Sequence, residues 1–344
     1  MTQAPPAART AVYVSNADSG DISVLHLDAH TGALTPVQRV PVGANVMPLA
    51  LSPDRRFLDA VLRAEPWEAI SFAIDPASGE LSPIGRGPLP HSMAYIATDR
   101  TGRFLFSASY GGDQVAVSPI GADGVVGPVH HVLPTPPHAH AIRSDPSNRF
   151  VFATSLGGGV VLQMRFDVES GELTPNVPPS LSPHERASPR HFVFGPDARF
   201  VYLLNELDAA IDVLAFDALA GTLRTVQTIA SLPHGFIGEP WAADLHLSPD
   251  GRFLYSSERR SSTLAMFGVD AASGELQLLG HQATQQQPRG FAITPDGRFL
   301  IVAGQLSHRL GVHAIDAHTG ALAPRGEIDV GRNPNWVECV VLTA

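Results

Sequence analysis

The chain has 344 residues, 44% of them hydrophobic, and a formal net charge of −10. Its 23 basic residues are all arginine, against 33 acidic residues, and surfaces for nucleic acid or anionic membranes need clustered cations. The composition therefore predicts no nucleic-acid partner and no membrane partner. We find neither a signal-peptide pattern after Met1 nor an apolar run that could span a bilayer, so we expect a cytoplasmic protein.

The chain begins with a predicted strand over residues 12–16 and then reaches the turn Asp28-Ala29-His30-Thr31-Gly32, followed by Leu34. This turn occurs seven times. Its glycine is Gly32 in the first copy and recurs at positions 79, 124, 171, 221, 274 and 320. Glycine supplies the positive φ that a hairpin turn requires. The spacing of 45 to 53 residues is typical of four-stranded propeller blades.

A second turn alternates with the first and ends in Arg-Phe or, once, Arg-Arg-Phe. Its six phenylalanines are Phe57, Phe104, Phe150, Phe200, Phe253 and Phe299. Together the two turns predict strands at 290–294, 299–303, 310–315 and 321–329 in the last complete unit. The antiparallel strands of one unit form one blade.

Six Arg-Phe turns stand against seven glycine turns, so one blade is split between the chain ends. We expect the last strand, residues 336–342, to pair with the first, residues 12–16, and so remove the free sheet edges. The predicted fold is an all-β, seven-bladed propeller closed in this way, forming one domain over residues 1–344. The lone Cys339 excludes an internal disulfide, and we expect it to be a buried, inert thiol.

Functional residues are expected on one face of the propeller, in the loop that enters each innermost strand and in the corner that leaves the second strand. Ten residues before the phenylalanine of each Arg-Phe turn stand Met47, Ala94, His140, Arg190, Ala243 and Arg289. Six residues after it stand Arg63, Tyr110, Leu156, Glu206, Arg259 and Gln305. Polar residues concentrate in the fourth to seventh copies and are predicted to point to one mouth of the central channel: His140, Arg190, His191, Glu206, Asp244, Glu258, Arg259, Arg289 and Gln305.

Charged side chains at such a mouth are costly to bury unless they are paired, so their clustering favours a functional site. The alternative is that they pair across neighbouring blades and hold the blades in register. The arginines of the Arg-Phe turns, by contrast, are interpreted as parts of turns, either solvated or linking blades.

His138 and His140 are two residues apart and would face the same way on a strand, as two metal ligands do. A third ligand would have to be Asp244 or His191. We expect no metal and no cofactor, because no further motif supports one. A Gly-x-Ser-x-Gly elbow, a His-Glu-x-x-His helix and a Gly-Lys phosphate loop are all missing from the sequence.

The sequence resembles the seven-bladed propeller lactonases, a family that includes bacterial 6-phosphogluconolactonase and fungal carboxymuconate cyclase. The likeness runs over essentially the whole chain and is most specific between about 188 and 337. It is carried by Pro189-Arg190-His191-Phe192-Val193-Phe194, Leu204-Asn205-Glu206-Leu207, Trp241-Ala242-Ala243-Asp244-Leu245-His246, Gln287-Pro288-Arg289-Gly290-Phe291 and Ala303-Gly304-Gln305.

The resemblance implies hydrolysis of a sugar-acid δ-lactone, with 6-phospho-D-glucono-1,5-lactone as the expected substrate and a place in the pentose phosphate pathway. One corner differs from the family: residues 154–159 read Thr-Ser-Leu-Gly-Gly-Gly, where relatives usually carry a basic element. Arg259, Arg260 or Arg186 could then bind a phosphate. Otherwise the substrate is an unphosphorylated aldono- or aldaro-lactone.

Lactone opening needs an activated water, an oxyanion partner and a proton for the departing ring oxygen. We expect Glu206 or His140 to remove the water proton, Arg190 and Arg289 to stabilise the oxyanion, and His191 to protonate or orient the leaving oxygen. The expected substrate-binding residues are His138, Asp244, Glu258, Arg259 and Gln305.

Two other functions are compatible with the sequence. A muconate-type cycloisomerase would use the same fold and a similar set of His, Glu and Arg. A non-enzymatic interaction propeller is the alternative from a different class, although scaffolds usually place unusual residues on an outer face. We expect a monomer or a weak homodimer.

Overall fold

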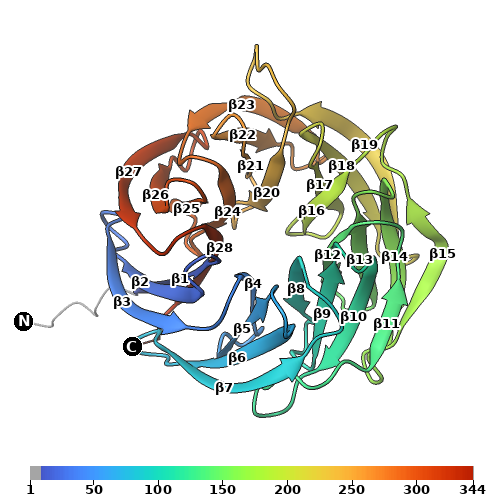
Figure 1. Cartoon of the computed structure of the whole chain (residues 1–344). Coiled ribbons are helices and arrows are strands. Elements are labelled where there is room, and N and C mark those ends of the chain that lie inside the picture. Colours follow the sequence, from blue (N-terminus) through green and yellow to red (C-terminus); the bar gives the residue numbers. More distant parts are fainter. Residues whose placement is uncertain (1–8, 344) are drawn as a thin grey trace, which may run out of the picture.

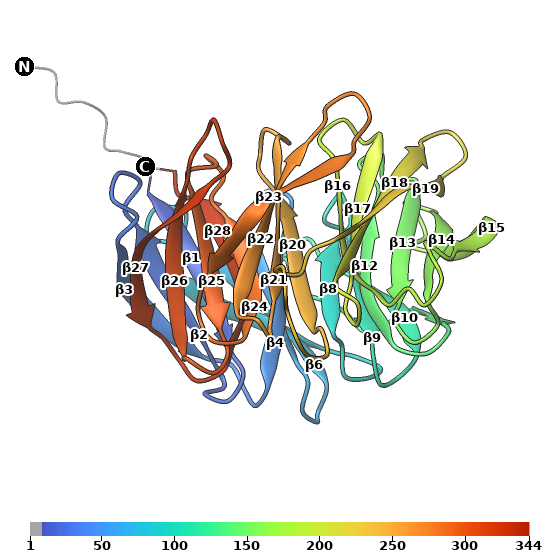
Figure 2. The same ribbon diagram turned by 90° about the horizontal axis from the view of Figure 1, so that it is seen from above.

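The computed structural model describes residues 9–343, which form 28 strands and no helix. The strands make seven four-stranded antiparallel sheets arranged as blades around one axis (Figure 1). Seen from the side, the blades form a disc (Figure 2). The predicted seven-bladed propeller is thereby confirmed. Among the described residues there is no helix that could cross a lipid bilayer.

The first strand of each blade lies nearest the axis and the second strand packs against it. The innermost strands are β4 (Val46–Leu51), β8 (Tyr95–Thr98), β12 (Ala139–Ser144), β16 (Pro189–Phe194), β20 (Ala242–Leu247), β24 (Pro288–Ile293) and β28 (Pro334–Val341). The second strands are β1 (Thr10–Asn16), β5 (Phe57–Leu62), β9 (Phe104–Ser109), β13 (Phe150–Ser155), β17 (Phe200–Asn205), β21 (Phe253–Glu258) and β25 (Phe299–Gly304).

The third and fourth strands complete each blade toward the rim. The third strands are β2 (Asp21–Leu27), β6 (Glu68–Ile74), β10 (Gln114–Pro119), β14 (Val160–Phe166), β18 (Ala210–Asp217), β22 (Thr263–Val269) and β26 (Arg309–Ile315). The outer strands are β3 (Leu34–Pro41), β7 (Leu81–Pro88), β11 (His131–Pro134), β15 (Leu173–Leu181), β19 (Thr222–Ala230), β23 (Leu276–Ala283) and β27 (Leu322–Asp329).

The ring closes where the sequence predicts. β28 pairs with β1 in antiparallel register, so one sheet has the order β28-β1-β2-β3. In that pairing Val337 lies opposite Val14, and both side chains are buried. The last strand therefore supplies the innermost strand of the first blade, and no blade is left with three strands.

The two faces of the disc differ in the turns that they carry. We call the face where the seven innermost strands begin the top face and the face where they end the bottom face. Because strands alternate in direction, the Arg-Phe turns and the Asp…Gly turns all lie on the bottom face.

The two repeated turns pack against each other across neighbouring blades. Gly221 has a φ of 68°, and a Cβ placed on it would lie 2.1 Å from Cδ1 of Phe150, in the blade before it. Arg149 reaches over the same gap and donates from Nη2 to the carbonyl oxygen of Ala218 at 2.5 Å. Arg103, Arg199 and Arg252 donate to the next blade in the same way, so four of the six arginines link blades, one of the two roles expected for them.

The innermost strands share an irregularity at their beginning. The pairing register shifts between Pro189 and His191 in β16, between Ala242 and Asp244 in β20 and between Pro288 and Phe291 in β24. A β-bulge leaves an extra residue unpaired and re-aims its side chain. The bulges fall at the top face, beside the axis, and they contain Arg190 and Arg289.

Candidate active site

The bulge in β16 explains how two consecutive residues enter the same cluster. In a regular strand the side chains of Arg190 and His191 would point to opposite faces. Here both are buried, and Nη1 of Arg190 lies 3.2 Å from Nε2 of His191. Nη1 of Arg190 also donates to the carbonyl oxygen of Ala243 in the bulge of the next blade.

Hydroxyl groups of the preceding blades fix the backbone of these bulges. Oγ1 of Thr154 donates to the carbonyl oxygen of Arg190 at 2.8 Å. In the same way Oγ of Ser257 donates to the carbonyl oxygen of Arg289 at 3.0 Å. Each arginine therefore starts from a backbone position that its neighbouring blade holds in place.

Glu206, in the corner after β17, is the acidic centre of the cluster. Its Oε2 accepts hydrogen bonds from Nε of Arg190 at 2.6 Å and from Nη2 of Arg259 at 3.1 Å. Its Oε1 accepts from Nε1 of Trp241 at 3.2 Å. Burial acts to raise the pKa of Glu206, but the charges of Arg190 and Arg259 outweigh it and lower that pKa. One ionised carboxylate thus orients two guanidinium groups.

Trp241 contacts the Arg259 guanidinium directly, and Glu258 fixes the backbone of Trp241. The Arg259 guanidinium lies 3.7 Å from the Trp241 ring centroid and donates from Nε to the Trp241 carbonyl oxygen at 3.0 Å. Glu258 accepts from the backbone N–H of Trp241 at 2.7 Å and from that of Ser261. One oxygen of Glu258 thus holds the residue before β20 and the other holds the corner between β21 and β22.

His191 is held at both ring nitrogens. Its Nδ1 lies 2.8 Å from Oδ1 of Asp244, which requires a proton on Nδ1 and leaves Nε2 as the acceptor for Arg190. Burial lowers the pKa of His191 to about 4, so the ring is neutral at pH 7. The second oxygen of Asp244 lies 3.2 Å from Nε2 of His246, further along β20.

His140 lies beside His191, and its imidazole is buried without a hydrogen-bond partner in the described chain. Their ring centroids are 5.1 Å apart. Nδ1 of His140 is buried, and neither ring nitrogen hydrogen-bonds to a group within residues 9–343. Burial and the nearby Arg190 charge hold the pKa of His140 well below its usual value of 6.5, so its imidazole is neutral and able to accept a proton.

Arg289 and Arg63 complete the cluster with charges that no acid balances. Within the described chain neither guanidinium has a carboxylate oxygen within 4.0 Å, whereas Arg190 and Arg259 share Glu206. Burial and the charges of Arg190, Arg259 and Arg63 lower the pKa of Arg289. Arginine stays protonated at neutral pH even so, and the cluster holds four guanidinium groups beside the carboxylates of Glu206, Asp244 and Glu258.

The structure brings together most, but not all, of the predicted site residues. Arg190, His191, Glu206, Asp244 and Arg259 form one hydrogen-bonded network, with His140 and Arg289 beside it. Glu258 supports the network through the backbone. Gln305 instead bonds to Gln287 at 3.0 Å and Asn333 at 2.8 Å, in the last blade.

The expectation that His138 and His140 face the same way along a strand was wrong. β12 begins only at Ala139, and His138 has a φ of 64°, so strand alternation does not apply to it. Its ring stacks on Tyr110 at 4.2 Å, while the His140 ring meets the edge of Tyr110 at 6.1 Å. Within residues 9–343, no three His, Cys, Asp or Glu side chains are grouped as metal ligands.

Four residues near the cluster were not selected from the sequence: Arg63, Tyr95, Trp241 and Trp336. Arg63 occupies the same position relative to its Arg-Phe turn as Glu206 and Arg259, and that alignment could have identified it. Tyr95 and Trp336 contact His191 at centroid distances of 5.1 and 5.8 Å, and each comes from a different blade. Their position follows only from the closed ring.

The comparisons with known proteins cover nearly the whole chain. The sequence model of a family described as "Lactonase, 7-bladed beta-propeller" matches residues 10–339. A 6-phosphogluconolactonase of Pectobacterium carotovorum is 42% identical over 332 residues, which are 96% of this chain and 98% of the relative. One from Serratia proteamaculans is 40% identical over 329 residues, 95% of this chain and 97% of that protein. Among solved structures, the periplasmic gluconolactonase PpgL of Pseudomonas aeruginosa superimposes with a TM-score of 0.92 and 32% identity, covering 97% of this chain and 100% of PpgL.

Proposed function

This chain belongs to the seven-bladed β-propeller lactonases and is a lactone hydrolase, and on that premise we propose that it opens 6-phospho-D-glucono-1,5-lactone to 6-phosphogluconate at the top-face cluster. The observation that carries the choice of a phosphorylated substrate is the pair Arg63 and Arg289, which have no acidic partner within residues 9–343. Two guanidinium groups suit a phosphate dianion, because their planar donors match its oxygens.

Arg63 and Arg289 thus take the part that the sequence assigned to Arg259, Arg260 or Arg186. Arg259 is already paired with Glu206. Burial and the charge of Arg190 lower the pKa of Arg63, and burial and the same charge lower the pKa of Arg289. Both effects support the placement of Arg63 and Arg289 beside Arg190. Assigning Arg289 to the phosphate also moves it away from the oxyanion role expected from the sequence.

Arg190 is our candidate for the oxyanion. Its Nε and Nη1 are fixed by Glu206, Ala243 and His191, while Nη2 has no hydrogen-bond partner among the described residues. A guanidinium that is already oriented costs little to reorganise when negative charge develops on the carbonyl oxygen. In this proposal His191 and Asp244 position Arg190, because both ring nitrogens of His191 are engaged.

His140 is our candidate for the base, in preference to Glu206. Glu206 accepts three hydrogen bonds and could take a proton only by weakening two ion pairs. His140 would remove one proton from water as the oxygen of that water bonds to the lactone carbon. The tetrahedral intermediate then breaks its bond to the ring oxygen, which receives the proton back from His140. No other proton donor is needed.

The test compares the enzyme with Glu206→Gln on 6-phosphogluconolactone, after subtraction of the uncatalysed rate. Gln keeps the shape of Glu206 but cannot pair with two guanidinium groups, so we expect kcat/KM to fall about 100-fold or more. The melting temperature should fall as well, because Arg190 and Arg259 stay buried without their acid, and turnover is therefore measured well below it. Parental turnover in this variant would contradict the proposed site.

A second candidate is a lactonase for an unphosphorylated aldono-lactone. The gluconolactonase PpgL resembles this chain over its full length, and that likeness favours this alternative. The corner at residues 154–159 also lacks a cation. Comparing kcat/KM for 6-phosphogluconolactone and glucono-δ-lactone distinguishes the two: our proposal requires a clear preference for the phosphorylated ring.

We propose that the reaction takes place in the cytoplasm, where phosphorylated sugars are made, and that the enzyme acts as a monomer or weak homodimer. PpgL, by contrast, is a periplasmic gluconolactonase. Fractionation of the native host and sedimentation of the purified enzyme test the two statements.

A further inference from the structure

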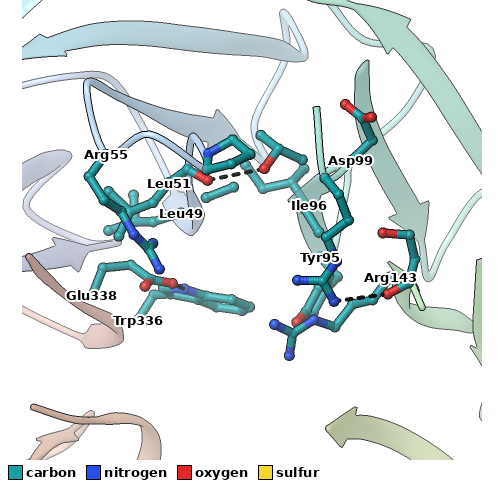
Figure 3. A pocket seen from close by; sticks show the side chains of 15 residues that line it. Leu49, Leu51, Arg55, Tyr95, Ile96, Asp99, Arg143, Trp336 and Glu338 are labelled. Atoms are coloured by element: carbon teal, nitrogen blue, oxygen red, sulfur yellow. Dashed lines mark hydrogen bonds between the residues drawn. The ribbon is translucent and has the colours of Figure 1, made fainter. Parts of the chain in front are cut away.

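A second charged cavity lies on the bottom side of the axis, away from the cluster at the top face. Two adjoining spaces of about 170 and 210 Å³ share the lining residues Arg55, Tyr95, Arg143, Trp336 and Glu338. In Figure 3, Arg55, Glu338 and Trp336 face Tyr95 and Arg143 across this space. Arg55 comes from an Arg-Phe turn, and the other four come from the innermost strands β8, β12 and β28.

An aromatic layer stands between this cavity and the top-face cluster. The rings of Tyr95, His191 and Trp336 are in mutual contact, with centroid distances of 5.1, 5.2 and 5.8 Å. His191 and Asp244 of the top-face cluster also line the upper of the two spaces, so the bottom cavity adjoins the proposed active site at this layer.

Three arginines and three acids line the cavity, and two of the arginines have no close carboxylate partner in the described part of the chain. Arg55 and Arg143 form no ion pair within 4.0 Å among residues 9–343, although both belong to a chain of net charge −10. Arg100 adds a third guanidinium, tied at 3.3 Å to the carbonyl oxygens of Ser144 and Asp145.

Asp99, Glu338 and Asp244 also line the cavity, and each is hydrogen-bonded to groups other than Arg55 and Arg143. Asp99 is fully engaged by its own turn and by Asn148. Burial raises the pKa of Glu338, and its Oε1 accepts from Nε1 of Trp336 at 3.0 Å. Asp244, at the upper end, is shared between His191 and His246.

We propose that this bottom cavity binds a small organic or inorganic oxyanion, a carboxylate or a phosphate, with Arg55 and Arg143 as its ligands and the Trp336 ring as its apolar wall. The volume admits a group no larger than a single sugar acid. The arginines of this site differ from those of the proposed lactone site, which it adjoins at His191 and Asp244.

Isothermal titration of the full chain with inorganic phosphate, D-gluconate and neutral D-glucose tests the site. Arg55→Asn removes the charge and keeps a residue that tolerates the φ of 62° found there. Arg56→Asn is the matched control, because Arg56 is the next residue of the same exposed turn and does not line this cavity. Arg143→Gln is the second site variant.

We expect at least one anion, but not glucose, to bind in a component that Arg55→Asn and Arg143→Gln each weaken at least about 10-fold. Arg56→Asn and Arg289→Gln should retain that component, and lactone turnover should remain parental in the two site variants. If only phosphate binds, the ligand of the cavity is an inorganic anion. If only gluconate binds, the ligand is an organic acid. The proposal is overturned if neither anion binds the parent, if both site variants keep parental affinity, or if Arg289→Gln abolishes all anion binding.

Discussion

At the residue scale, some arginines of the top-face cluster are paired with an acid and others are not. Arg190 and Arg259 are tied to Glu206, whereas Arg63, Arg289 and the ring of His140 have no such partner in the described chain. A paired guanidinium is fixed in direction, and an unpaired one gains most when an anion arrives. The pairing therefore divides the cluster into an oriented part and a part that receives substrate.

Replacing Arg190 by lysine tests the oriented part. A lysine ammonium keeps the charge but cannot bond to Glu206 through Nε while offering a second planar donor to the oxyanion. We expect kcat/KM to fall about 100-fold with little change in melting temperature. Arg199→Lys, in an exposed Arg-Phe turn, is the control and should behave as the parent; near-parental turnover in Arg190→Lys would restrict that residue to a structural role.

The pH profile tests the base. The pKa of His140 lies below 6.5, and the neutral ring is the active form, so activity is retained when the pH falls from 8 to 6.5 and is lost only at lower pH. We expect kcat/KM, corrected for spontaneous hydrolysis, to be flat above pH 6.5. His140→Gln should remove most activity across this range. An acid limb centred above pH 6.5 would contradict a depressed histidine as the base.

Sequence reasoning identified most members of the cluster but not their roles. It placed Arg190, Glu206 and Arg259 together because they share positions in the repeat. It did not select Arg63, because Arg63 lies outside the fourth to seventh copies, where polar residues concentrate. Which side chains pair depends on bulge geometry and on rotamers across blades, and neither has a sequence period.

At the scale of elements, one blade is joined to the next by its two turns. The glycine of each Asp…Gly turn lies against a phenylalanine of an Arg-Phe turn in six of the seven cases, and Gly79 lies against Ala11 and Tyr13 instead. The sequence predicted both turns and their glycines, since turn chemistry is local. It did not predict that they touch, because that contact spans about 70 residues, as between Gly221 and Phe150.

Gly221→Ala tests this contact. Alanine strains the backbone at a φ of 68° and brings its Cβ against the Phe150 ring, so we expect a loss of about 2–4 kcal/mol in the free energy of unfolding. Gly326→Ala is the control, since a Cβ there meets no atom within 4 Å and Gly326 has no positive φ. Equal denaturation midpoints for the two variants would show that the contact contributes nothing.

At the scale of the whole molecule, closure of the ring turns the chain ends into core. β1 is buried at every residue although it lies near the start of the chain, and β28 pairs with it over its length. The unequal number of turns in the sequence predicted this, because a strand without a partner must find one. The predicted strand limits, 12–16 and 336–342, differ from the observed limits by one or two residues.

Hydrogen exchange tests closure. Amides of β1 should exchange as slowly as those of β17, because both strands are paired on both sides. Amides of β28 should exchange as slowly as those of β16, because both are innermost strands that pair on one side only. Peptides covering residues 10–16, 189–194, 200–205 and 334–341 give the comparison. Fast exchange at 10–16 and 334–341 together with slow exchange at 189–194 and 200–205 would mean that the ring opens at this blade.

The most direct measurement of the central claim is the steady-state hydrolysis of 6-phosphogluconolactone and glucono-δ-lactone by the parent enzyme and by Arg63→Gln. If the free arginines of the top face hold the phosphate, the parent prefers the phosphorylated lactone, and Arg63→Gln raises KM for it about 10-fold or more while KM for the unphosphorylated ring is unchanged. A parent without this preference, or a variant that keeps parental KM for both lactones, would contradict the account.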